Sequence, residues 1–324
     1  MKPVTLLVWL LDQSPVLLCG LVLLVFAAFA PQMLAGQNLL NILEHSSGTG
    51  IAAVGMTLVL LTGGVDLSIG SLMFVAMAVS GKMIAAGQPI WLSLACGVVV
   101  GLAGGAINGL LITRLRVLPF IATLAMLFIL RGLGLWLTQT RALNMPSAVT
   151  ELAAARWGWV PLPILLFGLV ACGGQWWLSF TAAGRQIYAL GSDPLAAQKA
   201  GVRVTRLQLL VYVLSGGCAA LSGCVLLMQT GAVSPNFGEE KEFIAIAAAV
   251  LGGTSLFGGR GKLLPGTLCG AILFQTIETG LVQLRADPYA YPVARAGLIF
   301  AAVLLDTTRA RLTRRLTRRQ IRVE

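Results

Sequence analysis

Residues 188–204 read YALGSDPLAAQKAGVRV, a short polar stretch that lies between two long apolar segments. Either Ser192 or Asp193 can cap a helix through its side-chain oxygen, and Pro194 suits the first helical position. The run LAAQKA contains strong helix formers, and Gly201 suits the left-handed conformation with which many helices end. The stretch therefore predicts a complete helix of about two turns.

A helix this short is marginal in water on its own, so another part of the structure must hold it. Small Ala196, Ala197 and Ala200 lie beside polar Gln198 and Lys199, which leaves no bulky apolar face for anchoring at a membrane surface. A turn resting on the bilayer is the alternative. We expect instead a docking element for a cytoplasmic protein.

The composition of the whole chain indicates a membrane protein. Hydrophobic residues make up 57% of the 324 residues, charged residues make up 11%, and the mean hydropathy is +0.87. A water-facing surface cannot be built from so few polar side chains. Apolar blocks recur with about the 20 residues that a helix needs to cross ~30 Å of hydrocarbon. The predicted fold class is all-α: a polytopic integral membrane protein with about ten transmembrane helices.

The predicted spans are separated by short polar or Gly-rich segments. They cover residues 16–30, 41–62, 67–87, 90–112, 119–139, 161–180, 206–229, 243–257, 263–284 and 293–305. Helices that stop partway or re-enter are expected around 63–70 and 252–262.

Lysines and arginines set the orientation, because cytoplasmic loops carry an excess of them. Sixteen of the 23 lie at the two termini and in alternate loops, six lie on the opposite side, and Arg131 lies within a span. Both termini are therefore predicted to be cytoplasmic, as is the loop 181–205. We expect a membrane domain at 1–308 and a basic tail at 309–324 that lies against anionic lipid. No folded domain presents that tail to nucleic acid, so nucleic-acid binding is not expected.

Four longer segments carry a family resemblance. They are GMTLVLLTGGVDLSIGSL (55–72), LPFIATLAMLFILRGLGL (118–135), GRQIYALGSDPLAAQKAGVRVTRLQLLVYVLSG (184–216) and IAAAVLGGTSLFGGRGKLLPGTLCGA (246–271). With GLVQL (280–284) and AAVLLD (301–306), they make most of residues 40–306 similar to ATP-binding-cassette importer permeases of the ribose, xylose and autoinducer-2 type. The third segment resembles the cytoplasmic coupling loop of those permeases.

The resemblance implies a type II importer permease fold, like that of the vitamin B12 importer, in the bacterial inner membrane. It implies a transport subunit that is not an enzyme and that moves a pentose, a deoxyhexose or an autoinducer-2-like molecule into the cytoplasm. The implied partners are a second, identical or different permease, two cytoplasmic ATPase subunits or one fused tandem ATPase, and a periplasmic sugar-binding protein. The positions that match the ATPase-coupling helix are Gly191, Asp193, Pro194, Ala196, Ala197, Lys199 and Gly201.

No cofactor, metal or nucleotide site is expected in the chain. The stretch GGTSLFGGRGK (252–262) only partly resembles a phosphate-binding loop, because Lys262 is followed by Leu263 and no Gly lies five positions before Gly261. It is predicted to be a packed turn between two spans. The six cysteines all fall in apolar blocks, without the spacing of a metal or redox site.

Polar residues within the predicted spans are the candidates for a translocation path, although each could instead bond a neighbouring helix. The candidates are Asp66, Asn108, Gln229, Gln275 and Glu278. Asp66, followed by Ser68, also resembles the cap of a helix. Gln275 and Glu278 lie one turn apart, and Glu278 replaces a residue that is usually neutral in the family, which leaves the charge of the cargo open. His45 and the adjacent Glu44 are expected to be a boundary pair at the start of a span.

Two other functions remain alternatives at this stage. A permease for branched-chain amino acids shares the broad fold. An ion-gradient-driven secondary transporter needs a charged coupling site near the membrane midplane, and only Arg131 and Glu278 could provide one. The loops 140–161 and 231–243 are predicted to be periplasmic and to offer surfaces for a binding protein.

Overall fold

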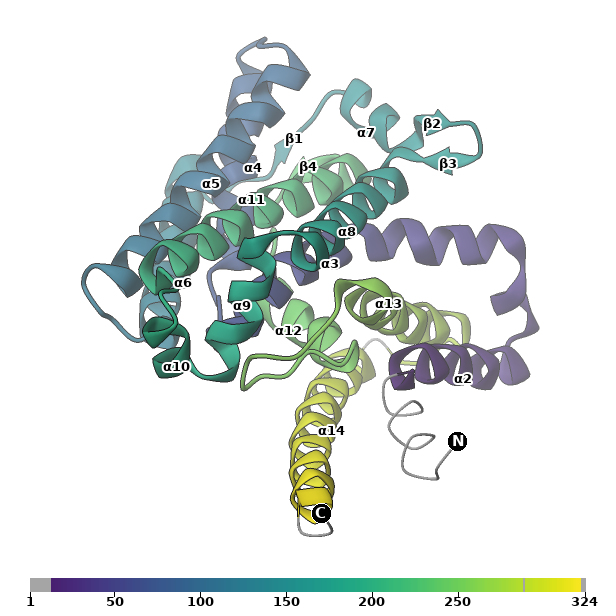
Figure 1. Ribbon diagram of the computed structural model, residues 1–324. Helices are drawn as coiled ribbons and strands as arrows, with labels where there is room; N and C mark the ends of the chain where they lie inside the picture. Colours follow the sequence, from purple (N-terminus) through teal and green to yellow (C-terminus); the bar gives the residue numbers. More distant parts are fainter. Residues whose placement is uncertain (1–12, 288, 322–324) are drawn as a thin grey trace.

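The computed structural model describes residues 13–287 and 289–321, with side chains described only through Leu304 and at Thr307 (Figure 1). The described part is mostly helical. The first half contains α2 (Ser14–Phe29), η1 (Pro31–Leu34), α3 (Gly36–Leu61), α4 (Ile69–Ala85), α5 (Ile90–Thr113), α6 (Pro119–Thr138) and α7 (Ser147–Ala154). The second half contains α8 (Leu162–Phe180), α9 (Ala182–Ser192), α10 (Pro194–Lys199), α11 (Val204–Thr230), α12 (Lys241–Leu251), η2 (Leu263–Thr267), α13 (Leu268–Gln283) and α14 (Ala290–Ile321).

Two short antiparallel strand pairs join loops in the described chain. β1 (Leu143–Asn144) pairs with β4 (Ala232–Val233), and β2 (Arg156–Trp157) forms a hairpin with β3 (Val160–Pro161). The first pair connects the two loops that are predicted to be periplasmic, and all four strands lie beside α7 in Figure 1. The all-α prediction therefore holds for the body of the molecule but not for these loop contacts.

Each predicted span contains a helix. The helix in the last span, α14, runs to Ile321, well past the predicted end at 305, and the helix in the predicted span 243–257 is shorter than expected. There α12 ends at Leu251, because the backbone turns at Gly252 and Gly253 adopts φ +88°, a left-handed conformation that ends helices. Among the described residues, four helices are long and apolar enough to cross a membrane: α5, α6, α8 and α11. Shorter apolar helices are α2, α4 and the first part of α14, Ala290–Leu304.

The basic tail lies only partly within the described residues. Its backbone continues α14 as a helix to Ile321, so no break separates the predicted membrane domain from the tail. The side chains of 309–321 and all of 322–324 lie outside the described part, as do residues 1–12, so the proposed lipid contact of the tail stays a prediction.

Contacts between backbones hold the centre of the fold together. On α5, a Cβ added to Gly101 or to Gly105 would overlap the carbonyl oxygens of Gly216 and Tyr212 on α11. Glycines at these positions let the two helices approach without intervening side chains, which is how small residues promote packing in membranes. Because α11 also packs along α3 and α4, it forms the central helix of the core.

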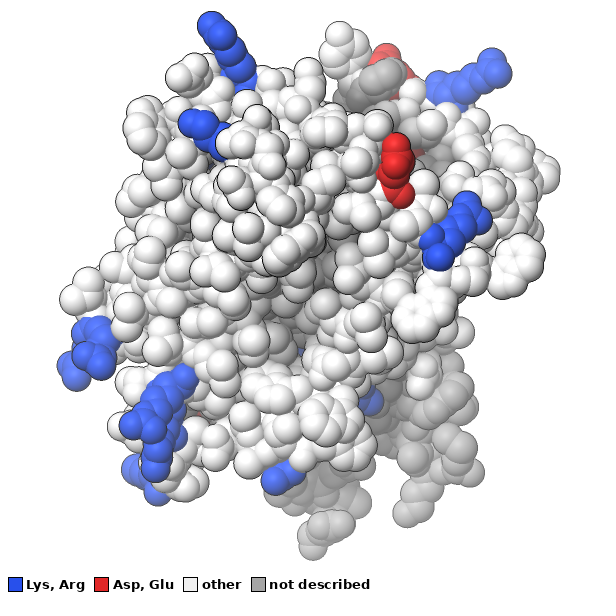
Figure 2. Space-filling view, turned by 90° about the horizontal axis from the view of Figure 1, so that it is seen from above, with Lys and Arg blue, Asp and Glu red and all other residues white. Residues whose placement is uncertain are grey.

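The outer surface fits a chain that faces lipid. Large apolar side chains are exposed on several helices, including Phe128 and Trp136 on α6 and Phe300 on α14. Figure 2 shows one face of the molecule, on which a few charged side chains are scattered and most of the surface between them is uncharged. Such a surface would be costly in water but is compatible with hydrocarbon.

Candidate functional site

The predicted helix at 194–199 is present as α10 and is capped as the sequence indicates. The Asp193 carboxylate accepts hydrogen bonds from the backbone N–H groups of Leu195 (2.9 Å) and Ala196 (3.0 Å), and Pro194 is the first helical residue. Gly201 has φ +83°. Of the two predicted cap residues, Ser192 has another role, because its hydroxyl donates to the Tyr188 carbonyl and closes α9.

The α10 helix stands out from the molecule. Within it only Ala197 is buried, with 4% of its surface exposed, whereas Leu195 is 71% exposed. Asp193, Pro194 and Lys199 are also exposed. The helix is thus held by its caps and by one small side chain, and it presents an apolar side chain to the outside.

The preceding helix, α9, is anchored in the body of the protein. Gly191 lies in α9 and not in α10, and a Cβ there would overlap the Leu61 carbonyl and the Gly259 amide. The Tyr188 hydroxyl donates to the Gly261 carbonyl at 2.9 Å. Burial raises the pKa of the Tyr188 phenol, so the group stays protonated and remains a donor at neutral pH.

The Gly-rich turn 252–262 connects α9 to the membrane helices (Figure 1). The Gly259 N–H donates to the Leu61 carbonyl at the end of α3 (3.0 Å). On the other side, the Gln175 side-chain oxygen on α8 accepts from the amides of Leu263 (2.9 Å) and Leu264 (3.0 Å). The prediction of a packed turn is confirmed, and a displacement of α9 would reach α3, α8 and the start of α13 together.

Asp66 and Asn108, two of the candidate path residues, lie in one buried hydrogen-bond network with no exposed surface. The Asp66 carboxylate accepts from the Ser68 hydroxyl (2.7 Å) and from the Ser215 hydroxyl (2.8 Å), and the Asn108 amide donates to the Ser68 hydroxyl (2.7 Å). The network links the start of α4 to α5 and α11. It satisfies the Asp66 carboxylate inside the fold, as a buried acidic group requires.

The expected cap at Asp66 needs a correction. The carboxylate does accept a backbone N–H, that of Ser68, at 3.0 Å, but Ser68 itself occupies the N-cap position of α4. Asp66 lies two residues before the N-cap, so its carboxylate stabilises the turn that precedes α4. A third candidate, Gln229 on α11, donates to the Glu44 carbonyl on α3 at 2.8 Å and bridges two helices.

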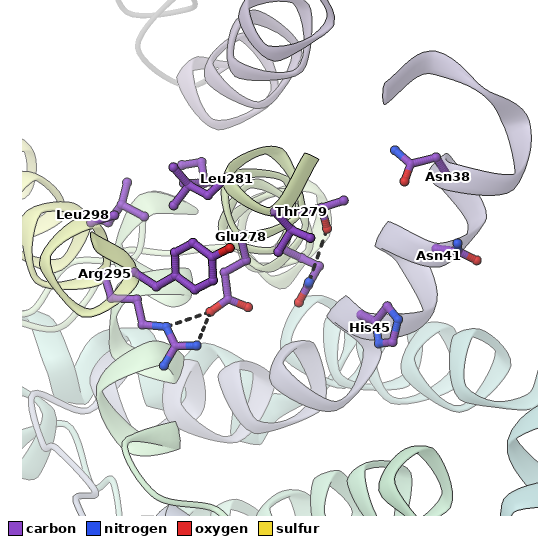
Figure 3. Close-up of a pocket in the computed structure, with 13 residues that line it drawn as sticks. Asn38, Asn41, His45, Glu278, Thr279, Leu281, Arg295 and Leu298 are labelled. Atoms are coloured by element: carbon purple, nitrogen blue, oxygen red, sulfur yellow. Dashed lines mark hydrogen bonds and ion pairs between the residues drawn. The ribbon is translucent and has the colours of Figure 1, made fainter. Parts of the chain in front are cut away.

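The last two candidates, Gln275 and Glu278, share a pocket of about 400 Å³ between α3, α13 and α14 (Figure 3). Its lining combines polar and apolar side chains. They are Asn38, Asn41, His45, Gln275, Ile277, Glu278, Thr279, Leu281, Val282, Tyr291, Ala294, Arg295 and Leu298. The structure thus brings Gln275 and Glu278 together in this pocket and Asp66 and Asn108 together in the buried network, and it places Gln229 apart from both.

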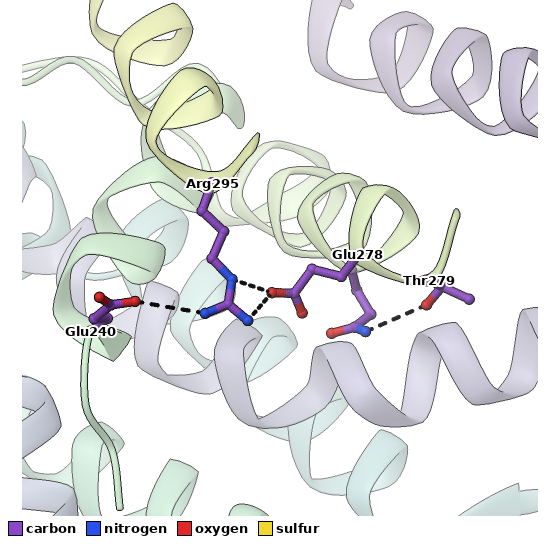
Figure 4. Close-up of polar contacts among 5 residues, drawn as sticks. Glu240, Glu278, Thr279 and Arg295 are labelled. Carbon is purple, nitrogen blue, oxygen red and sulfur yellow. Dashed lines mark hydrogen bonds and ion pairs between the residues drawn. The ribbon is translucent and has the colours of Figure 1, made fainter. Parts of the chain in front are cut away.

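The two charged residues that line this pocket, Glu278 and Arg295, are paired with each other. The Arg295 guanidinium on α14 donates to Oε1 of Glu278 from Nε (2.8 Å) and from Nη2 (2.7 Å), and its Nη1 lies 3.6 Å from Glu240 Oε2 (Figure 4). Sequence reasoning missed Arg295, since it follows Glu278 by 17 residues and a turn separates them. The contact depends on how α13 and α14 pack, which no local pattern reports.

The role of His45 in this pocket was also missed. His45 forms no ion pair with Glu44 among the described residues and lines the pocket instead. Adjacent residues on a helix point in different directions, so the side chains of Glu44 and His45 do not face each other. The signal that could have found it is the spacing of Asn38, Asn41 and His45, which puts three polar side chains on one face of α3.

Comparisons with known proteins identify the family. The family model described as "Branched-chain amino acid transport system / permease component" matches residues 38–305. The ribose import permease protein RbsC of Escherichia coli K12 is 36% identical over 306 residues, which cover 92% of this chain and 94% of the relative. The D-allose transport system permease protein AlsC of the same strain is 35% identical, covering 89% of each chain. No solved structure matches the chain.

A third relative, the autoinducer 2 import system permease protein LsrC of Enterobacter sp. 638, is 36% identical and covers 91% of this chain and 85% of the relative. The apolar helical body and these matches define a membrane permease, and the chain belongs to the branched-chain amino acid transport permease family. Within it, the chain is an ATP-binding-cassette importer permease of the ribose, sugar and autoinducer-2 type. It is accordingly a transport protein of the inner membrane.

Proposed function

We propose that the chain is the transmembrane subunit of an importer that moves a monosaccharide or a similar small polyhydroxy molecule into the cytoplasm, with ATP hydrolysed by a separate subunit. The relatives named for ribose, allose and autoinducer 2 support a sugar-like cargo, and none of these three is named for an amino acid. The observation that carries the proposal is α10, an exposed and doubly capped helix tied through α9 to the membrane helices.

We further propose that α10 docks on a cytoplasmic ATPase. Leu195 would enter an apolar groove of that partner, since its side chain is exposed between the small residues Pro194 and Ala196. The rigid path from α10 through Gly191 to Leu61 would turn movement of the ATPase into tilting of the spans. About ten spans, a type II importer fold, cytoplasmic termini, a second permease, and a periplasmic binding protein beside 140–161 and 231–243 belong to the same proposal.

The docking proposal is tested by copurification. Asp193→Arg removes the cap and places a cation at the positively polarised helix start, and Gly201→Leu forces a side chain into a left-handed conformation that costs about 1–2 kcal/mol. We expect both variants to insert into the membrane normally and to lose the ATPase subunits on purification.

The matched control is Asp193→Asn, because asparagine caps helices about as well as aspartate. It should retain the ATPase. If Asp193→Arg and Gly201→Leu complexes keep their ATPase subunits as fully as the control, α10 is not the docking element.

Transport itself is tested with the reconstituted complex in proteoliposomes. ATP-dependent accumulation of D-ribose, D-allose or D-fructose, but not of L-leucine, is the expected result. Uphill uptake by the isolated chain, driven by an ion gradient with no ATPase present, would instead make it a secondary transporter and would overturn the proposal.

A further inference from the structure

We propose that the pocket between α3, α13 and α14 is a transient binding site for an uncharged polyhydroxy solute on its way through the membrane. This inference rests on the proposed function of sugar import and names the place and chemistry of one step. It also answers the question that Glu278 raised, namely whether the cargo carries a charge.

The polar lining comes from two helix faces. Asn38, Asn41 and His45 follow one another on α3 at intervals of three and four residues, while Gln275 and Glu278 lie one turn apart on α13. Asparagine and glutamine each offer donors and acceptors, and a histidine ring offers at least one donor. A sugar hydroxyl also donates and accepts, so this lining matches a polyol better than it matches an apolar side chain.

The charge on Glu278 is cancelled inside the pocket. Both Arg295 bonds go to Oε1 of Glu278, and no hydrogen bond among the described residues uses Oε2. Glu278 therefore keeps Oε2 as an acceptor for a hydroxyl group, while its negative charge is balanced by a guanidinium whose Nε and Nη2 both contact Oε1. The third wall adds Tyr291 and Leu298, which give apolar surface of the kind that packs on a sugar ring.

The two charged side chains that line the pocket already pair with each other, and the nearby Lys241, which interacts electrostatically with Glu278, is not part of the lining. A carboxylate needs an unpaired cation and an ammonium needs an unpaired anion, but Arg295 contacts Glu278 and also lies 3.6 Å from Glu240. The volume of about 400 Å³ falls in the range of about 300–1,000 Å³ that is usual for small-molecule pockets. Asn41 and His45 are exposed at its edge, which suits brief occupancy because the solute can leave.

Binding is tested on the full chain in nanodiscs by saturation-transfer NMR with D-ribose, D-fructose and L-leucine as probes. We expect transfer to both sugars and none to leucine. Gln275→Leu and His45→Leu should lose most of the sugar signal. Gln88→Leu, the same substitution at an exposed loop position outside the pocket, should keep it. Equal sugar signals in all four proteins, or a leucine signal alone, would overturn the assignment.

The charge argument is tested by a double-mutant cycle on ATP-dependent D-ribose uptake by the complex. Glu278→Gln leaves the Arg295 guanidinium without its nearest partner, and Arg295→Gln leaves a carboxylate facing the pocket. Each single change should reduce uptake about tenfold, and the double change should restore it to within about threefold of the unaltered complex. If the two losses simply multiply, cancellation of charge is not the role of the pair.

Failure of this inference is distinct from failure of the proposed function. A complex of the unaltered chain that accumulates none of the three sugars in an ATP-dependent manner contradicts the function. A complex that accumulates D-ribose equally well with Gln275→Leu and with Gln88→Leu leaves sugar import standing and removes this pocket from the path.

Discussion

A single glycine determines how closely α9, which carries the proposed coupling helix α10, approaches the membrane helices. Gly191 lies against the carbonyl of Leu61 and the amide of Gly259, with no space for a Cβ. In most helices alanine is better than glycine by about 0.5–1 kcal/mol. Overpacking a rigid contact costs about 1–3 kcal/mol, so the steric term decides at this position.

Gly191→Ala should therefore lower the apparent melting temperature of the purified chain and weaken ATP-dependent uptake. Gly173→Ala, on the open side of α8 where nothing lies within 4 Å, is the matched control and should leave stability equal or slightly higher. Thermal unfolding in detergent measures both. A Gly191→Ala chain as stable as the control would show that α9 can move away from Leu61.

The buried Asp66 network gives a second prediction at the level of single residues. Asn108→Leu removes the donor to Ser68 and puts an apolar group beside the Ser68 hydroxyl that bonds Asp66. Leaving buried polar groups unsatisfied costs about 1–3 kcal/mol.

We expect Asn108→Leu to unfold at a clearly lower temperature than Thr113→Val, a control on the same helix that loses only a bond to its own turn. Equal melting temperatures for the two variants would mean that the network adds little to stability.

Individual helices and turns show which features the local sequence could predict. The caps of α10 were readable because Asp193, Pro194 and Gly201 act within a few residues of one another. The turn at 252–262 was readable from its glycines. Its partners were not, because Leu61 and Gln175 are distant in the sequence.

The same limit explains the pocket. Gln275 and Glu278 could be paired from their spacing on one helix, whereas Arg295 and His45 required the packing of three helices. The candidates Asp66, Asn108 and Gln229 share only the property of being polar within apolar blocks. That property does not separate a path from a bond between helices, and in this conformation all three make such bonds.

The turn 252–262 provides a prediction at the level of elements. Gln175→Leu removes the acceptor for two backbone amides at the start of η2, and Tyr188→Phe removes the donor to Gly261. We expect both variants to hydrolyse ATP in the assembled complex while sugar uptake per ATP falls, because the link from α9 to the helices is loosened. Gln186→Leu, elsewhere on exposed α9 surface, is the control. Unchanged uptake per ATP in both variants would contradict this route.

The whole molecule places its predicted periplasmic loops together through the β1–β4 pair. An epitope inserted after Gly158, in the exposed β2–β3 hairpin, should be accessible to antibody in spheroplasts. The same epitope inserted after Gln198 should react only after the membrane is opened. The reverse pattern would invert the orientation inferred from lysines and arginines.

The close glycine contact between α5 and α11 makes this part of the molecule more rigid than the rest. Carbonyls that touch the neighbouring backbone cannot slide past it without collision, so α5 and α11 behave as one rigid unit. The interface between α13 and α14 around Glu278 and Arg295 is different, since these long side chains can change rotamer while they stay paired. We expect the movements of opening and closing to be largest at this α13–α14 interface, while α5 and α11 remain fixed relative to each other.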